Sequence, residues 1–133
     1  MSLQVRILTP ESIFLNASAD EIILPTNTGQ MGVLSNHTPL ITAIDIGPML
    51  LRSDSNWQSI ALLGGFALVK DNQIIILVNE AELGSEINSE EAEANFLTAK
   101  EALANSQTRK AQIENNLAFK RARVRYQVAS QSK

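Results

Sequence analysis

Short apolar runs separated by turn-forming residues occupy the first two thirds of the chain. In the first run, apolar Leu3, Val5 and Ile7 alternate with polar Gln4 and Arg6, which predicts a strand with one buried face. Further strands are predicted at 13–15, 21–24, 40–44, 49–52, 57–63, 66–69 and 74–78. Many short strands with no helix between them indicate an antiparallel β-sandwich or a barrel.

The turn signals are clusters of Gly, Pro, Asn, Asp and Ser between these runs. They lie at 27–29, 35–39, 46–48, 53–56 and 71–72. The pairs Gly29 with Gly32 and Gly64 with Gly65 are interpreted as tight turns or bulges. A phosphate-binding loop would need a following helix, and strands are predicted on both sides of each pair. No cofactor site is therefore predicted.

The pattern changes at Gly84, because all 6 Gly and all 4 Pro of the chain lie at or before that residue. We predict a β-sandwich domain over 1–84 and a helical domain over 85–133, which gives an α+β fold class. Asn88 is a candidate N-cap for the first helix, with Glu91 three residues on.

The apolar positions of the second part have helical spacing. The first predicted helix carries a stripe formed by Ala92, Phe96, Ala99 and Leu103. The stripe of the second helix is formed by Ile113, Leu117, Val124 and Val128. Polar residues 105–108 interrupt the pattern between them, which favours an antiparallel hairpin.

Composition excludes several classes of site. The chain has no Cys and 1 His, so disulfides and thiolate metal sites are excluded. Its formal net charge of −3 argues against a general nucleic-acid binder. His37 is flanked by Ser35 and Thr38, but no nucleophile motif accompanies it, so a structural or surface role is favoured over catalysis. The acidic residues Glu80, Glu82 and Glu86 are interpreted as a solvated run.

Six basic residues are the most distinctive feature of the predicted hairpin. They are Arg109, Lys110, Lys120, Arg121, Arg123 and Arg125. They form either a solvated helix face, an RNA-binding surface or a surface that docks on an acidic protein. Because the chain as a whole is acidic, docking on a protein is favoured, and a stand-alone RNA-binding module is the alternative.

Several longer segments resemble one family. The segment 20–39 reads DEIILPTNTGQMGVLSNHTP, and it is followed by AIDIG at 43–47, LGGFA at 63–67 and VNEAE at 78–82. The C-terminal segment 114–123 reads ENNLAFKRAR. In this order the segments resemble the epsilon subunit of F-type ATP synthase, in its chloroplast and cyanobacterial form. The resemblance extends over essentially the whole chain.

The resemblance implies a non-catalytic rotor subunit that couples proton flow to rotation and restrains ATP hydrolysis. It implies that the sandwich packs on the gamma subunit and touches the c-ring, with Gln30, Met31 and His37 as the contacts with the c-ring or gamma. It also implies that the mobile hairpin docks on the alpha and beta subunits through the six basic residues. The implied location is peripheral, on the stromal or cytoplasmic side of a chloroplast or cyanobacterial thylakoid membrane.

Some bacterial relatives bind ATP through an Ile/Leu-Asp-x-x-Arg-Ala motif at the start of the first helix. The matching segment here, 87–92, reads INSEEA. Asn88 stands in place of the Asp and Glu91 in place of the Arg, so we expect no tight ATP binding.

Overall fold

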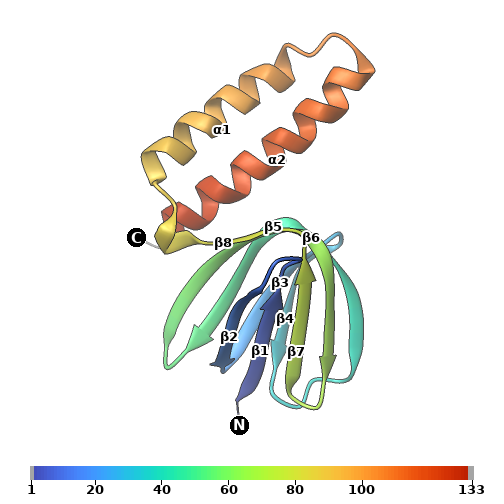
Figure 1. The fold of residues 1–133 in the computed structure, drawn as a ribbon, viewed down its shortest axis with the longest axis vertical. Helices are drawn as coiled ribbons and strands as arrows, with labels where there is room; N and C mark the ends of the chain where they lie inside the picture. Colours follow the sequence, from blue (N-terminus) through green and yellow to red (C-terminus); the bar gives the residue numbers. More distant parts are fainter. Residues whose placement is uncertain (1, 132–133) are drawn as a thin grey trace.

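Along the described part of the chain the eight strands precede the two helices, and the helical hairpin lies at one end of the β-sandwich (Figure 1). The structure is a computed structural model that describes residues 2–131. The strands are β1 (Leu3–Leu8), β2 (Ile13–Ala19), β3 (Glu21–Thr26), β4 (Gly29–Leu34), β5 (Leu40–Ser53), β6 (Asn56–Lys70), β7 (Gln73–Val78) and β8 (Ala81–Leu83). A 3-10 turn η1 (Gly84–Glu86) leads into α1 (Ser89–Ala104) and α2 (Arg109–Gln131). The predicted α+β class is confirmed. The predicted antiparallel pairing holds in the sandwich except between β1 and β7, which are parallel.

One sheet folds over itself to form both layers of the sandwich. The strand order is β2-β1-β7-β6-β5-β3-β4, and β8 pairs with β6. The long strands β5 and β6 belong to both layers, because β6 pairs with β8 at residues 60–62 and with β7 at residues 65–70. Gly64, between these two segments, has a φ of +80°, a conformation that glycine adopts without strain.

Strands β5 and β6 continue without a break from one layer to the other, which corrects two sequence predictions. The predicted turn at 46–48 lies inside β5, and the predicted strands 57–63 and 66–69 form the single strand β6. Pro48 is tolerated because β3 pairs with β5 only at residues 50–52, which leaves the ladder incomplete beside it. Strands β4 and β8 were not predicted, because their glycine and alanine content gives little strand signal.

The predicted turns at 53–56 and 71–72 are confirmed as tight hairpin connections. Asp54 and Ser55 have φ values of 52° and 69°, and Asp71 and Asn72 have φ values of 52° and 62°. Positive φ at both central residues is the geometry that matches the twist of paired strands, and Asn and Asp tolerate it better than most residues.

The main core lies between the two layers and is contributed entirely by strand residues. Its largest fully buried side chains are Leu3, Ile7, Ile22, Leu24, Met49, Ile60, Leu62, Ile74 and Ile76. A second, smaller cluster joins the sandwich to the helices. It contains Ala61, Leu63, Ile87, Ala92, Val124, Val128 and Ala129.

Side-chain caps begin both helices. The side chain of Asn88 accepts a hydrogen bond from the Glu91 amide at 3.0 Å, which confirms the predicted N-cap. Thr108 accepts one from the Ala111 amide at 3.0 Å. The predicted stripe of α1 is at least partly buried at all four of its positions, which confirms it as the inner face of that helix.

The second helix differs from the prediction because it has two apolar faces. Val124 and Val128 are buried in the second cluster, whereas Ile113 and Leu117 of the same stripe are 63% and 45% exposed. The contact with α1 is made from another face. There Phe119 and Tyr126 lie against Phe96 with ring centroids 5.4 and 5.3 Å apart. The stripe therefore extends beyond the edge of the sandwich.

Candidate functional site

An apolar surface covers the outer side of three neighbouring strands. Two cross-strand rows build it, because Ile41 pairs with Leu68 and Leu68 with Ile75, while Ala43 pairs with Phe66 and Phe66 with Leu77. Among these residues Ile41, Phe66, Leu77 and Leu68 are 72%, 61%, 53% and 40% exposed. We call Ile41, Ala43, Phe66, Leu68, Ile75 and Leu77 the apolar face.

The strands of the apolar face are apolar on both sides. Ala67 and Val69 of β6 and Ile76 of β7 point into the core, while their chain neighbours point outward. Strands that are apolar on both sides are typical of sheets covered on both faces, and a contiguous exposed apolar patch marks an interaction site. The sequence prediction missed this surface. The uninterrupted apolar runs at 66–69 and 74–78 were the signal that could have found it.

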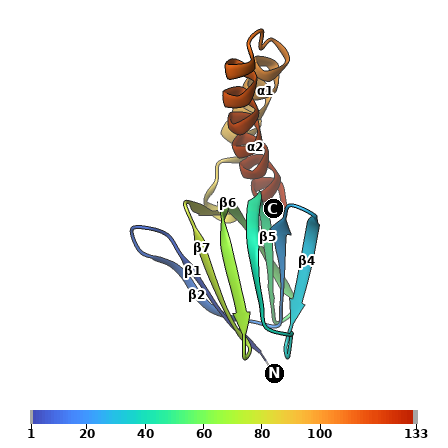
Figure 2. The same ribbon diagram turned by 90° about the vertical axis from the view of Figure 1, so that its right-hand side faces the viewer.

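The structure separates the residues predicted to contact the c-ring and gamma. Gln30 is exposed near the start of β4, and Met31 beside it packs partly against the core. His37 lies beyond the other end of that strand, which points away from the helices (Figure 2). At about 3.3 Å per residue, the strand holds Gln30 and His37 far apart, so they do not form one site.

His37 belongs to the end of the sandwich remote from the hairpin. Its Nδ1 lies 2.7 Å from the Thr38 carbonyl oxygen. The adjacent Asn36 amide donates to Asn72 Oδ1 at 2.6 Å, which ties this loop to the turn between β6 and β7. His37 therefore adjoins the strands of the apolar face, whereas Gln30 does not.

The six basic residues of α2 occupy different environments. Arg109, Lys110, Arg121 and Arg123 are exposed, and Lys120 is half-buried. Arg123 lies over the ring of Phe119, with its guanidinium carbon 5.3 Å from the ring centroid. Arg109 and Lys110 begin the helix at the free tip of the hairpin, far along α2 from Arg125. The residues extend along the helix instead of converging on one point.

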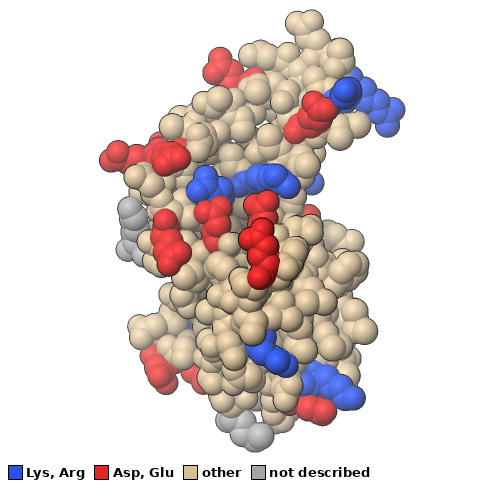
Figure 3. Space-filling view, in the orientation of Figure 1, with Lys and Arg blue, Asp and Glu red and all other residues tan. Residues whose placement is uncertain are grey.

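Arg125 is the basic residue that contacts the sandwich. Its Nε lies 2.8 Å from Glu82 Oε1 and its Nη2 lies 3.2 Å from Glu82 Oε2. Figure 3 shows Lys and Arg side chains of the hairpin directly above a row of Asp and Glu side chains on the adjoining end of the sandwich. This complementary charge accompanies the apolar contact of Val124 and Val128 with Ala61 and Leu63.

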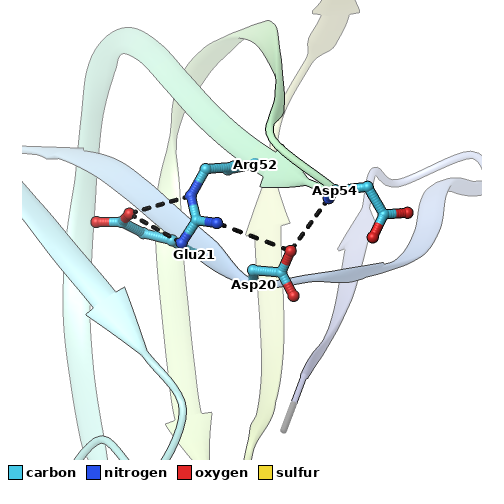
Figure 4. Close-up of polar contacts among 4 residues, drawn as sticks. All are labelled: Asp20, Glu21, Arg52 and Asp54. Atoms are coloured by element: carbon cyan, nitrogen blue, oxygen red, sulfur yellow. Dashed lines mark hydrogen bonds and ion pairs between the residues drawn. The ribbon is translucent and has the colours of Figure 1, made fainter.

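A separate polar cluster ties the β2–β3 corner to the β5–β6 turn (Figure 4). The guanidinium of Arg52 lies 3.4 Å from Glu21 Oε1 and 3.8 Å from Asp20 Oδ2. Asp20 Oδ2 also accepts a hydrogen bond from the Asp54 amide at 3.1 Å. The guanidinium carbon of Arg52 lies 5.8 Å from the centroid of the Trp57 ring. The carboxylates of Asp20 and Glu21 each have a partner within the fold, so we assign this cluster a structural role.

No helix in the described part of the chain is long and apolar enough to cross a membrane.

Comparison with known families matches residues 2–84 to "ATP synthase, Delta/Epsilon chain, beta-sandwich domain". Residues 85–130 match the long alpha-helix domain of the same chain.

Among characterised sequences, the chain is similar to chloroplastic ATP synthase epsilon chains. It is 86% identical to that of Nephroselmis olivacea and 63% identical to that of Chlorella vulgaris, covering 98% of each chain in both cases. Among solved structures, a chain of the Euglena gracilis mitochondrial ATP synthase (OSCP/F1/c-ring) is similar, with a TM-score of 0.83 and 21% identity. That likeness covers 98% of this chain and 81% of the other.

A chain of the Tetrahymena thermophila mitochondrial ATP synthase, from a structure of its central stalk and c-ring, has a TM-score of 0.64 and 16% identity. That likeness covers 100% of this chain and 98% of the other. At these identities the two structural likenesses show a shared fold.

Proposed function

This chain belongs to the ATP synthase delta/epsilon family and is a non-catalytic subunit of that complex, and we propose that its surfaces serve the rotor as follows. The sandwich binds gamma and the c-ring, so that proton-driven rotation is coupled to ATP synthesis. The hairpin docks on the alpha and beta subunits and restrains ATP hydrolysis. The family assignment gives the RNA-binding alternative no support.

The exposed apolar face is the observation that carries the proposed gamma contact. Its two rows span β5, β6 and β7 without a charged residue, and burial against another protein removes this surface from water. In the family, the sandwich packs on gamma. The apolar face is therefore the surface through which this subunit binds gamma.

A charge placed in the apolar face tests the proposed gamma contact. Phe66→Glu buries an unpaired carboxylate on binding, so gamma binding weakens at least about tenfold. Leu34→Glu is the matched control, because Leu34 is 53% exposed on β4, outside the apolar face. Affinity is measured with purified gamma by calorimetry. Equal affinities for the two variants would place the gamma contact elsewhere.

Two different partners are contacted by the residues Gln30, Met31 and His37. His37 adjoins the strands of the apolar face and so contacts gamma. Gln30 and Met31 lie at the opposite end of β4, where the exposed Gln30 amide suits the polar loops of the c-ring. Since the chain has no Cys, Gln30→Cys and His37→Cys allow separate cross-linking in the assembled enzyme. Cross-links of both residues to the same partner would contradict this division.

The basic residues of α2 provide the inhibitory contact with the catalytic subunits. Complementary charge steers such docking, and single exposed pairs are worth only about 0–1 kcal/mol each, so several act together. Replacing Lys120, Arg121, Arg123 and Arg125 by Ala releases ATPase inhibition in the assembled enzyme. Lys100→Ala, which removes a charge from the exposed side of α1, leaves inhibition intact. Unchanged inhibition in the fourfold variant would reject this role.

The similarity to chloroplastic epsilon chains supports a chloroplast location. We further propose a peripheral position on the stromal side of the thylakoid membrane, reached through the complex. Residues 1–84 and 85–133 act there as separate units, one bound to the rotor and one free to move. In support, every residue of the main core lies within 3–78.

A further inference from the structure

The layer that carries the apolar face continues past β7 onto β1 and β2 (Figure 2). Strand β1 pairs in parallel with β7, and β2 pairs with the other edge of β1. Each cross-strand row of the apolar face therefore has one further member on β1 and one on β2. The first row gains Arg6 and Asn16, and the second gains Leu8 and Ile13.

The row that contains Phe66 stays apolar from β5 to β2. Its added members are Leu8, which is half-buried, and Ile13, which is 63% exposed. Beside this row lies a hollow of about 360 Å³, whose lining includes Leu8, Pro10, Phe66 and Leu77. A hollow of this kind accepts an apolar anchor side chain of a partner protein. The apolar surface open to a partner thus reaches beyond the apolar face.

The other row differs because Arg6 introduces a charge. Arg6 is the cross-strand partner of Ile75, and its side chain is half-buried. All other members of the two rows are uncharged. Within the described part of the chain, no carboxylate lies within ion-pair distance of Arg6. The fold therefore supplies this cation with no anion of its own.

The polar neighbours of Arg6 bond to one another. Gln4 Nε2 donates to Asn16 Oδ1 at 2.6 Å, and Ser18 Oγ donates to Gln4 Oε1 at 3.4 Å. Asn16 lies opposite Arg6 on β2, so the amide oxygen nearest in register already accepts from Gln4. A guanidinium carries five N–H donors in a planar fork, and these remain available to a partner.

We propose that Arg6 pairs with a carboxylate of gamma at the edge of the apolar face, and that this pair fixes the orientation in which the sandwich binds. The inference rests on the proposed gamma contact. Removal of an unpaired charge from water is costly, so a partner that covers Ile75 and Leu8 has to offer an anion to Arg6. Apolar rows supply burial with little direction, whereas a carboxylate meets the planar guanidinium in a defined geometry.

Two substitutions separate this pair from general charge. Arg6→Gln removes the cation, so affinity for purified gamma, measured by calorimetry, falls about tenfold. Lys70→Gln is the matched control, because Lys70 carries the same charge one row away, in the row of Gln73 and Gln4. This control keeps the affinity within about twofold of the native value. Equal weakening by both variants would overturn the specific pair, and so would unchanged affinity with Arg6→Gln.

Ionic strength gives a readout that a merely structural effect would not move. Salt screens charged contacts, so the affinity of the native chain for gamma falls as salt is raised. We expect a smaller fall with Arg6→Gln, because one charged contact is already missing. A loss of affinity in that variant with the native salt dependence would show that the substitution acts on packing, and it would overturn the pair.

A chemical cross-link identifies the partner group. Arg6→Lys replaces the guanidinium by an amine, and a carbodiimide joins an amine to a carboxylate in contact with it. In the assembled enzyme, mass spectrometry should find position 6 joined to an Asp or Glu side chain of gamma. A link from position 6 to another subunit, without one to gamma, would overturn the proposal.

Failure of the proposed gamma contact looks different from failure of the pair. If gamma does not bind the apolar face, Phe66→Glu binds gamma as tightly as the native chain does. If Phe66→Glu weakens binding while Arg6→Gln does not, the gamma contact stands and the pairing of Arg6 is rejected.

Discussion

Phe96 of α1 stacks on Tyr126 of α2 with ring centroids 5.3 Å apart and ring planes inclined by 20°. Phe96 also contacts Phe119, whose ring centroid is 5.4 Å away. One aromatic residue of α1 thus contacts two rings of α2 that lie about two turns apart along that helix. These contacts place Phe96 in the interface between the two helices.

Phe96→Ala is expected to weaken the hairpin more than the sandwich. Loss of two ring contacts and of a half-buried side chain costs about 2 kcal/mol. Far-UV circular dichroism during thermal unfolding should show earlier loss of helix, while Trp57 fluorescence reports an unchanged sandwich transition. Leu97→Ala is the control, because Leu97 is 54% exposed. Equal loss of helix in both variants would contradict a stabilising role of the Phe96 ring contacts.

The N-cap of α1 gives a second prediction. Asn88→Ala leaves the Glu91 amide without its partner and should destabilise the hairpin by about 1 kcal/mol. Asn88→Ser keeps an oxygen at the cap and should restore most of this loss. Helix content is measured by circular dichroism. A Ser variant as unstable as the Ala variant would show that capping is not the cause.

Gly65 and Gly32 differ sharply in the space around them. A Cβ on Gly65 would collide with the backbone of Leu77 and Val78, so Gly65→Ala must push β7 away from β6 and should cost about 2–3 kcal/mol. A Cβ on Gly32 would meet only Glu21 Oε2 at 3.8 Å, an ordinary contact. Urea unfolding followed by Trp57 fluorescence should therefore separate Gly65→Ala from a near-neutral Gly32→Ala. Similar midpoints would argue against the tight strand contact.

A chain ending at Gly84 should fold by itself. The main core is complete without the helices, and the sandwich loses only the cover of Ile46, Ala61 and Leu63. We expect a single cooperative urea transition by Trp57 fluorescence, at a lower midpoint than that of the full chain. A broad, non-cooperative transition would mean that residues 1–84 are not a separate folding unit.

The elements that depend on local chemistry could be predicted from the order of residues alone. Asn88 was predictable as a cap because an N-cap needs only a short polar side chain at a helix start. The turn at Asp71 and Asn72 was predictable for the same reason, since these residues tolerate positive φ. The inner face of α1 followed from spacing along one helix. The family resemblance came from long segments whose order in the chain carries the information.

Features that depend on partners distant in sequence could be seen only in the folded molecule. Periodicity placed Ile113 and Val128 on one stripe, but the edge of the sandwich leaves one exposed and buries the other. Helical spacing gave Arg109 and Arg125 the same interpretation, whereas β8 brings Glu82 to Arg125 alone. Gln30 and His37 were close in sequence, yet β4 separates them. Burial and pairing are set by which surfaces meet in three dimensions, and a one-dimensional pattern does not contain that information.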